Sequence, residues 1–208
     1  MDPDERSQLK TETRRCGQRA SFIFGWFPKR MIVAVVAVLL SGLVMTNHSG
    51  AQALSEYQIK AAFLFNFAKF VEWPPTAFSD PAAPLILGIV GEDPFGPALE
   101  QTVMGKTVNN RSLVIKRFSN RQTLEPCHIL FVSQSEQGHL AQIIAAVRSS
   151  NTLTVSETEQ FLDFGGMVNF LTVGNKIRFE IYQGAAERAG LRLSSKLLSL
   201  AATVRTDG

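Results

Sequence analysis

Short apolar runs and spaced apolar stripes alternate along residues 54–208, which is typical of a chain that alternates strands with helices. Continuous runs predict strands over 84–90, 112–118, 128–132 and 152–155. Apolar spacings of three and four, with start and stop residues, predict helices over 55–73, 94–103, 136–148 and 157–164. Alternating residues flank a Gly-Asn turn, which predicts a hairpin made of 167–173 and 176–182. Two helices are predicted to close the chain: one over 184–189, and one capped by Ser194 with Leu197, Leu198, Ala201 and Val204 on its inner face.

The first predicted helix is apolar over more than one stripe. Ser55 is its expected N-cap, and Pro74-Pro75 is its expected stop. One stripe holds Ile59, Phe63, Phe67 and Phe70, and the surface is widened by Leu64, Phe65, Ala68 and Val71. A helix of this kind is either buried on several sides or offers one side to a partner.

The order of the elements indicates the fold class. Apolar strands that alternate with helices favour a parallel sheet covered on both faces. We therefore predict a single-domain α/β sandwich with a mostly parallel sheet, helices on both faces and a C-terminal antiparallel hairpin. A domain of this length buries a core of its own and needs no metal or disulfide to fold.

Residues 29–53 have the three parts of a cleavable export signal. Lys29-Arg30 supplies positive charge, residues 31–44 are an uncharged apolar run, and Ala51-Gln52-Ala53 is a small-x-small cleavage pattern. The apolar run is shorter than the roughly 20 residues that a membrane-spanning helix needs. We therefore expect residues 1–53 to be an N-terminal extension and signal peptide cut near Ala53, and residues 54–208 to form a periplasmic domain.

The export signal changes the charge balance of the chain. The whole sequence carries a formal net charge of +3. Residues 1–53 hold seven Lys and Arg against four Asp and Glu, whereas residues 54–208 hold fourteen of each. A nucleic-acid partner is therefore not expected, because such binding needs clustered positive charge on the folded domain.

Motifs for catalysis and cofactor binding are missing from residues 54–208. The loop 91–97 has the glycine spacing of a phosphate-binding loop, but Pro97 stands where a lysine is needed. Neither His128 nor His139 has a neighbour at metal-ligand spacing, and there is no Gly-x-Ser-x-Gly elbow. We therefore predict a binding protein without catalytic residues, cofactor or metal.

Cys127 is the one cysteine of residues 54–208, since Cys16 lies in the leader. A lone cysteine cannot form an internal disulfide in an oxidising compartment. Cys127 opens an apolar strand, so it is either a buried structural thiol or, if it is accessible, a reactive or intermolecularly bridged one.

Two surfaces are candidates for binding. Parallel sheets hold ligands at the carboxyl ends of their strands, where Glu92 and Asp93 follow one strand and Ser133 and Gln134 follow another. These four residues are the candidate ligand crevice. The second candidate is an apolar patch on the first helix and at its exit, Trp73, because an exposed Trp often anchors a partner.

Three segments resemble the YfiR-like periplasmic family. They are residues 60–74 (KAAFLFNFAKFVEWP), 165–170 (GGMVNF) and 179–201 (FEIYQGAAERAGLRLSSKLLSLA). Their order and spacing, and the export signal before them, extend the resemblance over residues 54–205. The best-known member of this family is stabilised by disulfides. Redox control of folding or activity is not expected here, because residues 54–208 hold a single cysteine.

The resemblance implies a regulatory role rather than an enzymatic one. The founding protein of the family binds the periplasmic domain of an inner-membrane diguanylate cyclase, represses it, and so lowers cyclic di-GMP and biofilm formation. By this resemblance the partner here is the periplasmic domain of such a cyclase or of another membrane sensor, and a homodimer is also expected. The candidate partner-binding residues are Phe65, Phe70, Trp73, Glu180 and Glu187.

Two other functions stay open at this point. One is a periplasmic small-ligand module that presents its bound state to a membrane receptor or kinase, and it would use the crevice near Glu92 and Ser133. The other is a hydrolase of envelope material, which would need His128 or His139 beside a nucleophile.

Overall fold

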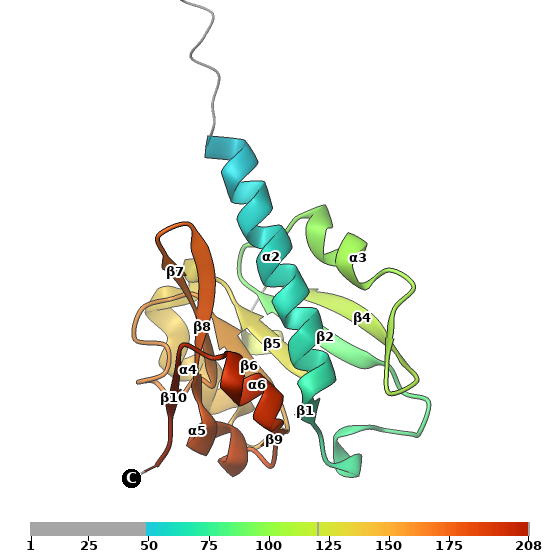
Figure 1. The fold of residues 1–208 in the computed structure, drawn as a ribbon. Coiled ribbons are helices and arrows are strands. Elements are labelled where there is room, and N and C mark those ends of the chain that lie inside the picture. Colours follow the sequence, from blue (N-terminus) through green and yellow to red (C-terminus); the bar gives the residue numbers. More distant parts are fainter. Residues whose placement is uncertain (1–48, 120, 208) are drawn as a thin grey trace, which may run out of the picture. The chain divides into compact units, whose positions relative to one another are not determined.

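The computed structural model describes residues 49–119 and 121–207, and within them eight strands form one mixed sheet (Figure 1). The strand order is β10-β8-β7-β6-β5-β2-β4-β3. The strands are β2 (Leu85–Val90), β3 (Thr107–Val108), β4 (Arg111–Phe118), β5 (Ile129–Val132), β6 (Leu153–Ser156), β7 (Val168–Val173), β8 (Lys176–Tyr182) and β10 (Thr203–Arg205). The neighbours from β4 through β2, β5 and β6 to β7 are parallel, and β10 is parallel to β8. The pairs β7·β8 and β3·β4 are antiparallel.

Helices cover both faces of this sheet. The helix α2 (Ser49–Phe70) crosses one face, as Figure 1 shows. The same core receives side chains from α3 (Pro97–Val103), α5 (Gln183–Arg188) and α6 (Ser195–Leu200), whereas α4 (Leu140–Val147) packs into a second core. Short 3-10 turns lie at Pro75–Ala77, Arg121–Thr123 and Gln134–His139. A separate antiparallel pair, β1 (Val71–Glu72) and β9 (Arg192–Leu193), joins the exit of α2 to the segment before α6.

The side chains of β5 show why both faces are covered. Ile129 and Phe131 point into the core beneath α2, and Leu130 and Val132 point into the core beneath α4. All four side chains are fully buried. A strand buried on both sides has no polar face, which is why its sequence reads as a continuous apolar run.

The chain reverses its direction of travel across the sheet between β2 and β5. From β2 it passes through α3 to β4 on one side, and it then returns to β5 on the other side of β2. The two crossover helices α3 and α4 belong to different cores and therefore to different faces. Such a reversal leaves a crevice at the carboxyl ends of the two strands, because the loops that follow them diverge.

The structure confirms the predicted fold class: an α/β arrangement with a mostly parallel sheet and a C-terminal antiparallel pair. The predicted strands and the hairpin are present, with ends that differ by one residue where they differ at all. The face of α4 is also confirmed, because Leu140, Ile143, Ile144 and Val147 are all buried.

Four local predictions are wrong. The first helix ends at Phe70 rather than at Trp73, because Val71 and Glu72 pair with β9 as the strand β1. Residues 157–164 form turns rather than a helix, because Gln160 has a positive φ of 62° and the Ser156 hydroxyl accepts a hydrogen bond from the Thr158 N–H. Val204 is not on the last helix, which ends at Leu200, but in β10. Ser55 is not an N-cap, since α2 already begins at Ser49.

Most of the predicted export signal lies outside the described residues. The predicted cleavage point near Ala53 falls within α2. The division of the chain at residue 53 stays a prediction. Within residues 49–119 and 121–207, no helix is both long enough and apolar enough to cross a bilayer.

Candidate functional site

A crevice opens at the carboxyl ends of β2, β5 and β6. It consists of two hollows of about 580 and 390 Å³. They share the lining residues Tyr57, Gln134 and Glu157, so they form one continuous depression. The first half of α2 forms one wall, and β7 and β8 extend past the end of the short β6 to form another. The crevice therefore lies at the reversal point of the sheet.

The four predicted crevice residues are brought together by the fold. Glu92, Asp93, Ser133 and Gln134 all line the smaller hollow. The Glu92 N–H donates to the Ser135 hydroxyl at 2.9 Å, which joins the loop after β2 to the loop after β5. Asp93 has a structural role, because its carboxylate accepts hydrogen bonds from the Phe95 N–H at 2.8 Å and from Arg117 at 2.7 Å.

Gly91 is the residue that lets these two loops approach each other. Its φ of 90° lies in the left-handed region, which side chains disfavour. A Cβ at this position would lie 2.4 Å from the Ser135 hydroxyl oxygen and 2.9 Å from Glu136 Cγ. The glycine that resembled part of a phosphate-binding loop is thus required for loop packing.

A buried lysine forms the floor of the larger hollow. Lys60 is only 3% exposed, and its ammonium contacts the Glu56 carboxylate at 2.5 Å and the Glu157 carboxylate. The Tyr57 hydroxyl donates to the other oxygen of Glu157 at 2.9 Å, and the Lys60 ammonium lies 4.7 Å from the centre of the Tyr57 ring. The charge of Lys60 is therefore fully compensated within the protein.

The phenol of Tyr57 is a donor that stays protonated. Burial raises the pKa of Tyr57 well above its ordinary value, and the negative charge of Glu157 raises it further. A hydroxyl that cannot ionise keeps its hydrogen bond to Glu157 over the whole physiological range. Tyr57 and Lys60 together hold the Glu157 carboxylate in one position.

Sequence reasoning missed Lys60 and Glu157 as site residues. One signal was present: Lys60 precedes Leu64 and Phe67 by four and seven positions, so it occupies the stripe that the core buries. A lysine in a buried stripe needs an anionic partner. Nothing in the sequence pointed to Glu157 as that partner, because it lies 97 positions away.

Two of the predicted partner-binding residues lie together on α2 and are half-buried. The Phe65 ring has the ammonium groups of Lys106 and Lys69 at 4.8 and 5.7 Å from its centre. The Phe70 ring has those of Lys196 and Lys69 at 5.1 and 5.9 Å. We call these five residues the lysine–phenylalanine face. It combines two half-buried aromatic rings with three nearby positive charges.

Trp73 serves as an anchor within the domain. Its indole N–H donates to the His128 carbonyl oxygen at 3.2 Å, and its ring meets the His128 ring edge-on. The side chain packs against the core beneath α2. The indole thus fixes the exit of α2 to the start of β5.

The remaining predicted partner-binding residues lie elsewhere. Phe179 and Ile181 contribute to the core beneath α2, so Glu180 between them points to the other side of the sheet and reaches the larger hollow. Glu187 is exposed on α5, where it accepts a hydrogen bond from Gln183 at 2.7 Å. The five predicted residues do not form one patch.

Cys127 and His128 are structural groups at the amino end of β5. Burial raises the pKa of the Cys127 thiol to about 12, so a thiolate is disfavoured. His128 accepts a hydrogen bond at Nδ1 from the Ile86 N–H at 2.9 Å, which leaves Nε2 to donate to the Ala77 carbonyl at 3.1 Å. Burial lowers the pKa of His128, and the nearby Arg111 charge lowers it further. Both ring nitrogens are occupied, so the imidazole is not presented as a base.

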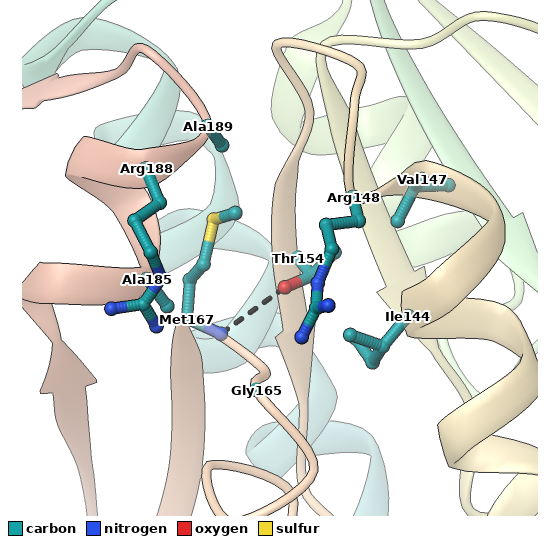
Figure 2. A pocket seen from close by; sticks show the side chains of 9 residues that line it. All are labelled: Ile144, Val147, Arg148, Thr154, Gly165, Met167, Ala185, Arg188 and Ala189. Atoms are coloured by element: carbon teal, nitrogen blue, oxygen red, sulfur yellow. Dashed lines mark hydrogen bonds between the residues drawn. The ribbon is translucent and has the colours of Figure 1, made fainter.

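A third hollow lies between α4 and α5. Figure 2 shows its apolar lining with Arg148 and Arg188 at its two sides, and the Met167 N–H donating to the Thr154 hydroxyl at 3.1 Å. Its volume is about 40 Å³, room for at most a few water molecules. It is too small for an organic ligand.

Among residues 49–119 and 121–207, no group of three or more His, Cys, Asp and Glu side chains is gathered closely enough to hold an ion.

Comparison with known proteins identifies the family. Residues 57–202 match the family model described as YfiR/HmsC-like. No curated protein matches the chain. Two solved structures are similar over part of their length: a conserved domain protein from Vibrio cholerae O1 biovar El Tor (10% identity, TM-score 0.45, 58% of this chain and 54% of that one) and an ABC domain in complex with L-Trp from Streptococcus pneumoniae (8% identity, TM-score 0.43, 58% and 55%). The chain thus spans about half the length of these two structures. With the family model matched over nearly all of the described sheet and its helices, the chain belongs to the YfiR/HmsC-like family.

Proposed function

We propose that this protein is a periplasmic regulator that binds the periplasmic domain of an inner-membrane diguanylate cyclase and holds the cyclase inactive. The observation that carries the proposal is the family match over residues 57–202, because this family is regulatory and periplasmic. The export signal predicted over residues 29–53 supports the same compartment.

The mechanism we propose is a population shift in the cyclase. A regulator that binds one conformation of a sensor domain more tightly than another moves the equilibrium toward that conformation. The regulator needs no catalytic group for this. The size of the shift is set by the difference between its binding free energies for the two conformations. Repression by this protein would therefore require a tight contact surface rather than a reactive site.

The lysine–phenylalanine face is the surface that we propose for this contact. Phe65 and Phe70 are half-buried, and aromatic side chains are enriched among the residues that dominate binding energy. Lys69, Lys106 and Lys196 surround them. A complementary partner surface would carry carboxylates around an apolar centre.

Co-purification from envelope fractions tests the proposal. Tagged protein is expected to retain the membrane cyclase through its periplasmic domain. Charge reversal of Lys69, Lys106 and Lys196 to Glu is expected to abolish retention without disturbing the core, since Lys69 and Lys106 are exposed on α2 and beyond α3, and Lys196 is exposed on α6. The matched control is Lys176→Glu at the hairpin turn, which should retain the cyclase as the unmodified protein does. If unmodified protein and the triple variant retain equal amounts of cyclase, this surface is not the contact.

A second candidate function is favoured by a specific observation, the crevice. A periplasmic small-ligand module would bind a metabolite at the carboxyl ends of the strands and present its bound state to a membrane receptor or kinase. The hollows of about 580 and 390 Å³ are of the size that holds small molecules. The two functions are compatible, because a ligand in the crevice could alter the affinity of the protein for its partner.

A further inference from the structure

A fourth hollow lies at the opposite end of the sheet from the crevice, at the amino ends of β2, β5 and β6. Its volume is about 340 Å³, and cavities of this size hold small molecules. Its lining comes from three segments, residues 76–86, 126–128 and 150–152. It shares no described lining residue with the crevice, so the two are separate sites.

The lining of this hollow carries no charge. No described residue that lines it is Asp, Glu, Lys or Arg. Its one imidazole, His128, is neutral, since Nδ1 accepts a hydrogen bond from the Ile86 N–H and burial lowers the pKa of the ring. A charged ligand would lose its hydration here without gaining a counter-ion, which costs free energy. The hollow therefore favours an uncharged ligand, in contrast to the crevice, whose walls carry carboxylates.

Most polar groups of the lining already have hydrogen-bond partners within the domain. The Ser150 hydroxyl, the Thr152 hydroxyl and the Asn151 amide nitrogen each donate to a backbone carbonyl oxygen, at 2.7, 2.6 and 2.8 Å. Both ring nitrogens of His128 are also occupied. A polar ligand atom placed against such groups would lose its hydrogen bonds to water without replacing them. The ligand is therefore expected to be mainly apolar as well as uncharged.

The aromatic wall of the hollow is held in place by contacts within the protein. The Phe78 and His128 rings are stacked with their centres 4.4 Å apart, and the Arg111 guanidinium carbon lies 3.8 Å from the centre of the Phe78 ring. Arg111 also donates to the Ala83 carbonyl at 2.6 Å, which ties the same loop to β4. The other apolar residues of the lining are Ala77, Ala83, Pro84, Ile86 and Pro126. A wall fixed before binding loses little conformational freedom when a ligand binds, which favours affinity.

We propose that this hollow binds an uncharged, mainly apolar small molecule of the class of aromatic alcohols. The apolar body of the ligand lies against Phe78, Pro84 and Ile86, where its surface is removed from water. The site lies apart from the crevice and from the lysine–phenylalanine face. The inference therefore goes beyond the proposed regulation of a cyclase and does not rest on it.

Calorimetry on the purified protein at pH 7 tests the inference, with 2-naphthol as the probe and 2-naphthoate as its charged counterpart. The two compounds share a ring system, but the hydroxyl of the first keeps its proton at this pH whereas the carboxyl of the second loses it. Saturable binding of 2-naphthol at one site per chain is expected. Binding of 2-naphthoate should be weaker by about tenfold or more, because its charge finds no counter-ion in the hollow.

Variants of the lining locate the binding. Ala83→Leu enlarges a lining side chain and is expected to weaken 2-naphthol binding by about tenfold or more, because the ligand loses part of its space. Phe78→Leu removes the aromatic wall and should also weaken binding, so it serves as a second variant. Ala145→Leu is the matched control, since Ala145 is exposed on α4 and does not line the hollow, and it should leave the affinity unchanged. Thermal unfolding without ligand shows whether each variant is folded.

Three results would contradict the inference. The first is the absence of saturable 2-naphthol binding up to its solubility limit. The second is equal affinity for 2-naphthol and 2-naphthoate, which would mean that the site does not select an uncharged ligand. The third is unchanged affinity in folded Ala83→Leu and Phe78→Leu proteins, which would place the binding elsewhere on the molecule. None of these results depends on the presence of a cyclase, so the proposed regulatory function is tested separately.

Discussion

The ammonium of Lys60 and the carboxylate of Glu157 form an ion pair across 97 positions of sequence. Their side chains are only 4% and 10% exposed. The pair joins α2 to the loop that follows β6, and so it fixes two walls of the crevice relative to each other. Removing one member of such a pair leaves the other charge buried without compensation.

Replacement of Lys60 by Met is therefore expected to destabilise the protein by about 3–5 kcal/mol. Urea unfolding measures this change. Lys176→Met on the exposed hairpin turn is the matched control and is expected to change the free energy of unfolding by less than about 0.5 kcal/mol. Equal stability of the two variants would mean that the ion pair is not a structural element of the crevice.

Gly91→Ala is predicted to destabilise the protein by about 1–3 kcal/mol, because a non-glycine residue is strained at a φ of 90° and its Cβ would collide with the Ser135 hydroxyl. Gly138→Ala in the turn Gln134–His139 is the control, since its Cβ would meet nothing within 4 Å. Denaturant unfolding of both variants checks the prediction. A Gly91→Ala protein as stable as the Gly138→Ala protein would contradict the packing of the two loops.

The thiol of Cys127 is predicted to be inert in the folded protein. It is 8% exposed, and burial raises its pKa to about 12. Iodoacetamide at pH 8 should therefore label it only as fast as the protein unfolds, and labelling should follow the urea transition. Stoichiometric labelling of native protein within minutes would show an accessible thiolate instead.

His128 is predicted to make stability depend on pH. Its pKa is lowered in the folded state, so the unfolded state binds the proton more readily. The stability that neutral His128 contributes is complete above the pKa of its unfolded state, about 6.5. It is lost as the pH falls from there toward the lower pKa of the folded state. Unfolding free energies of the unmodified protein and His128→Asn should converge as the pH falls through this window. A constant difference between them would contradict the neutral imidazole.

The layers of the fold were predictable from local pattern. Residues 129–132 are a continuous apolar run, and residues 140–147 bury apolar side chains at the helical period. Each of these assignments rests on neighbours in sequence. The short strands β1, β3, β9 and β10 were not predicted. They have two or three residues each, and their pairing depends on partners brought close by the whole fold.

The crevice was half predictable. Glu92, Asp93, Ser133 and Gln134 follow apolar strands, so the rule for parallel sheets places them at one edge. Glu157 was assigned to a helix over residues 157–164, which Gly165-Gly166 was expected to end. Hydrogen bonds of Ser156 and Thr158, together with the left-handed Gln160, instead turn this segment toward Lys60. Competition of this kind between side-chain and backbone hydrogen bonds is decided by tertiary contacts.

The role of Trp73 was open for a related reason. A lone Trp at a helix exit reads equally well as a surface anchor or as a packing residue. Its hydrogen bond to the His128 carbonyl, 55 positions away, makes it a packing residue within the domain. Trp73→Phe should therefore lower stability while leaving partner retention intact at a temperature where the variant is folded. Loss of cyclase retention in a fully folded variant would show that Trp73 contacts the partner.

The central claim is that this protein represses a membrane diguanylate cyclase from the periplasm. Cellular cyclic di-GMP, measured by mass spectrometry in a strain that has the cyclase, tests it most directly. Deletion of the gene is expected to raise cyclic di-GMP several-fold, and the unmodified gene should restore the low level whereas the Lys69, Lys106, Lys196 charge-reversal variant should not. A cyclic di-GMP level that is unchanged by the deletion would contradict the account.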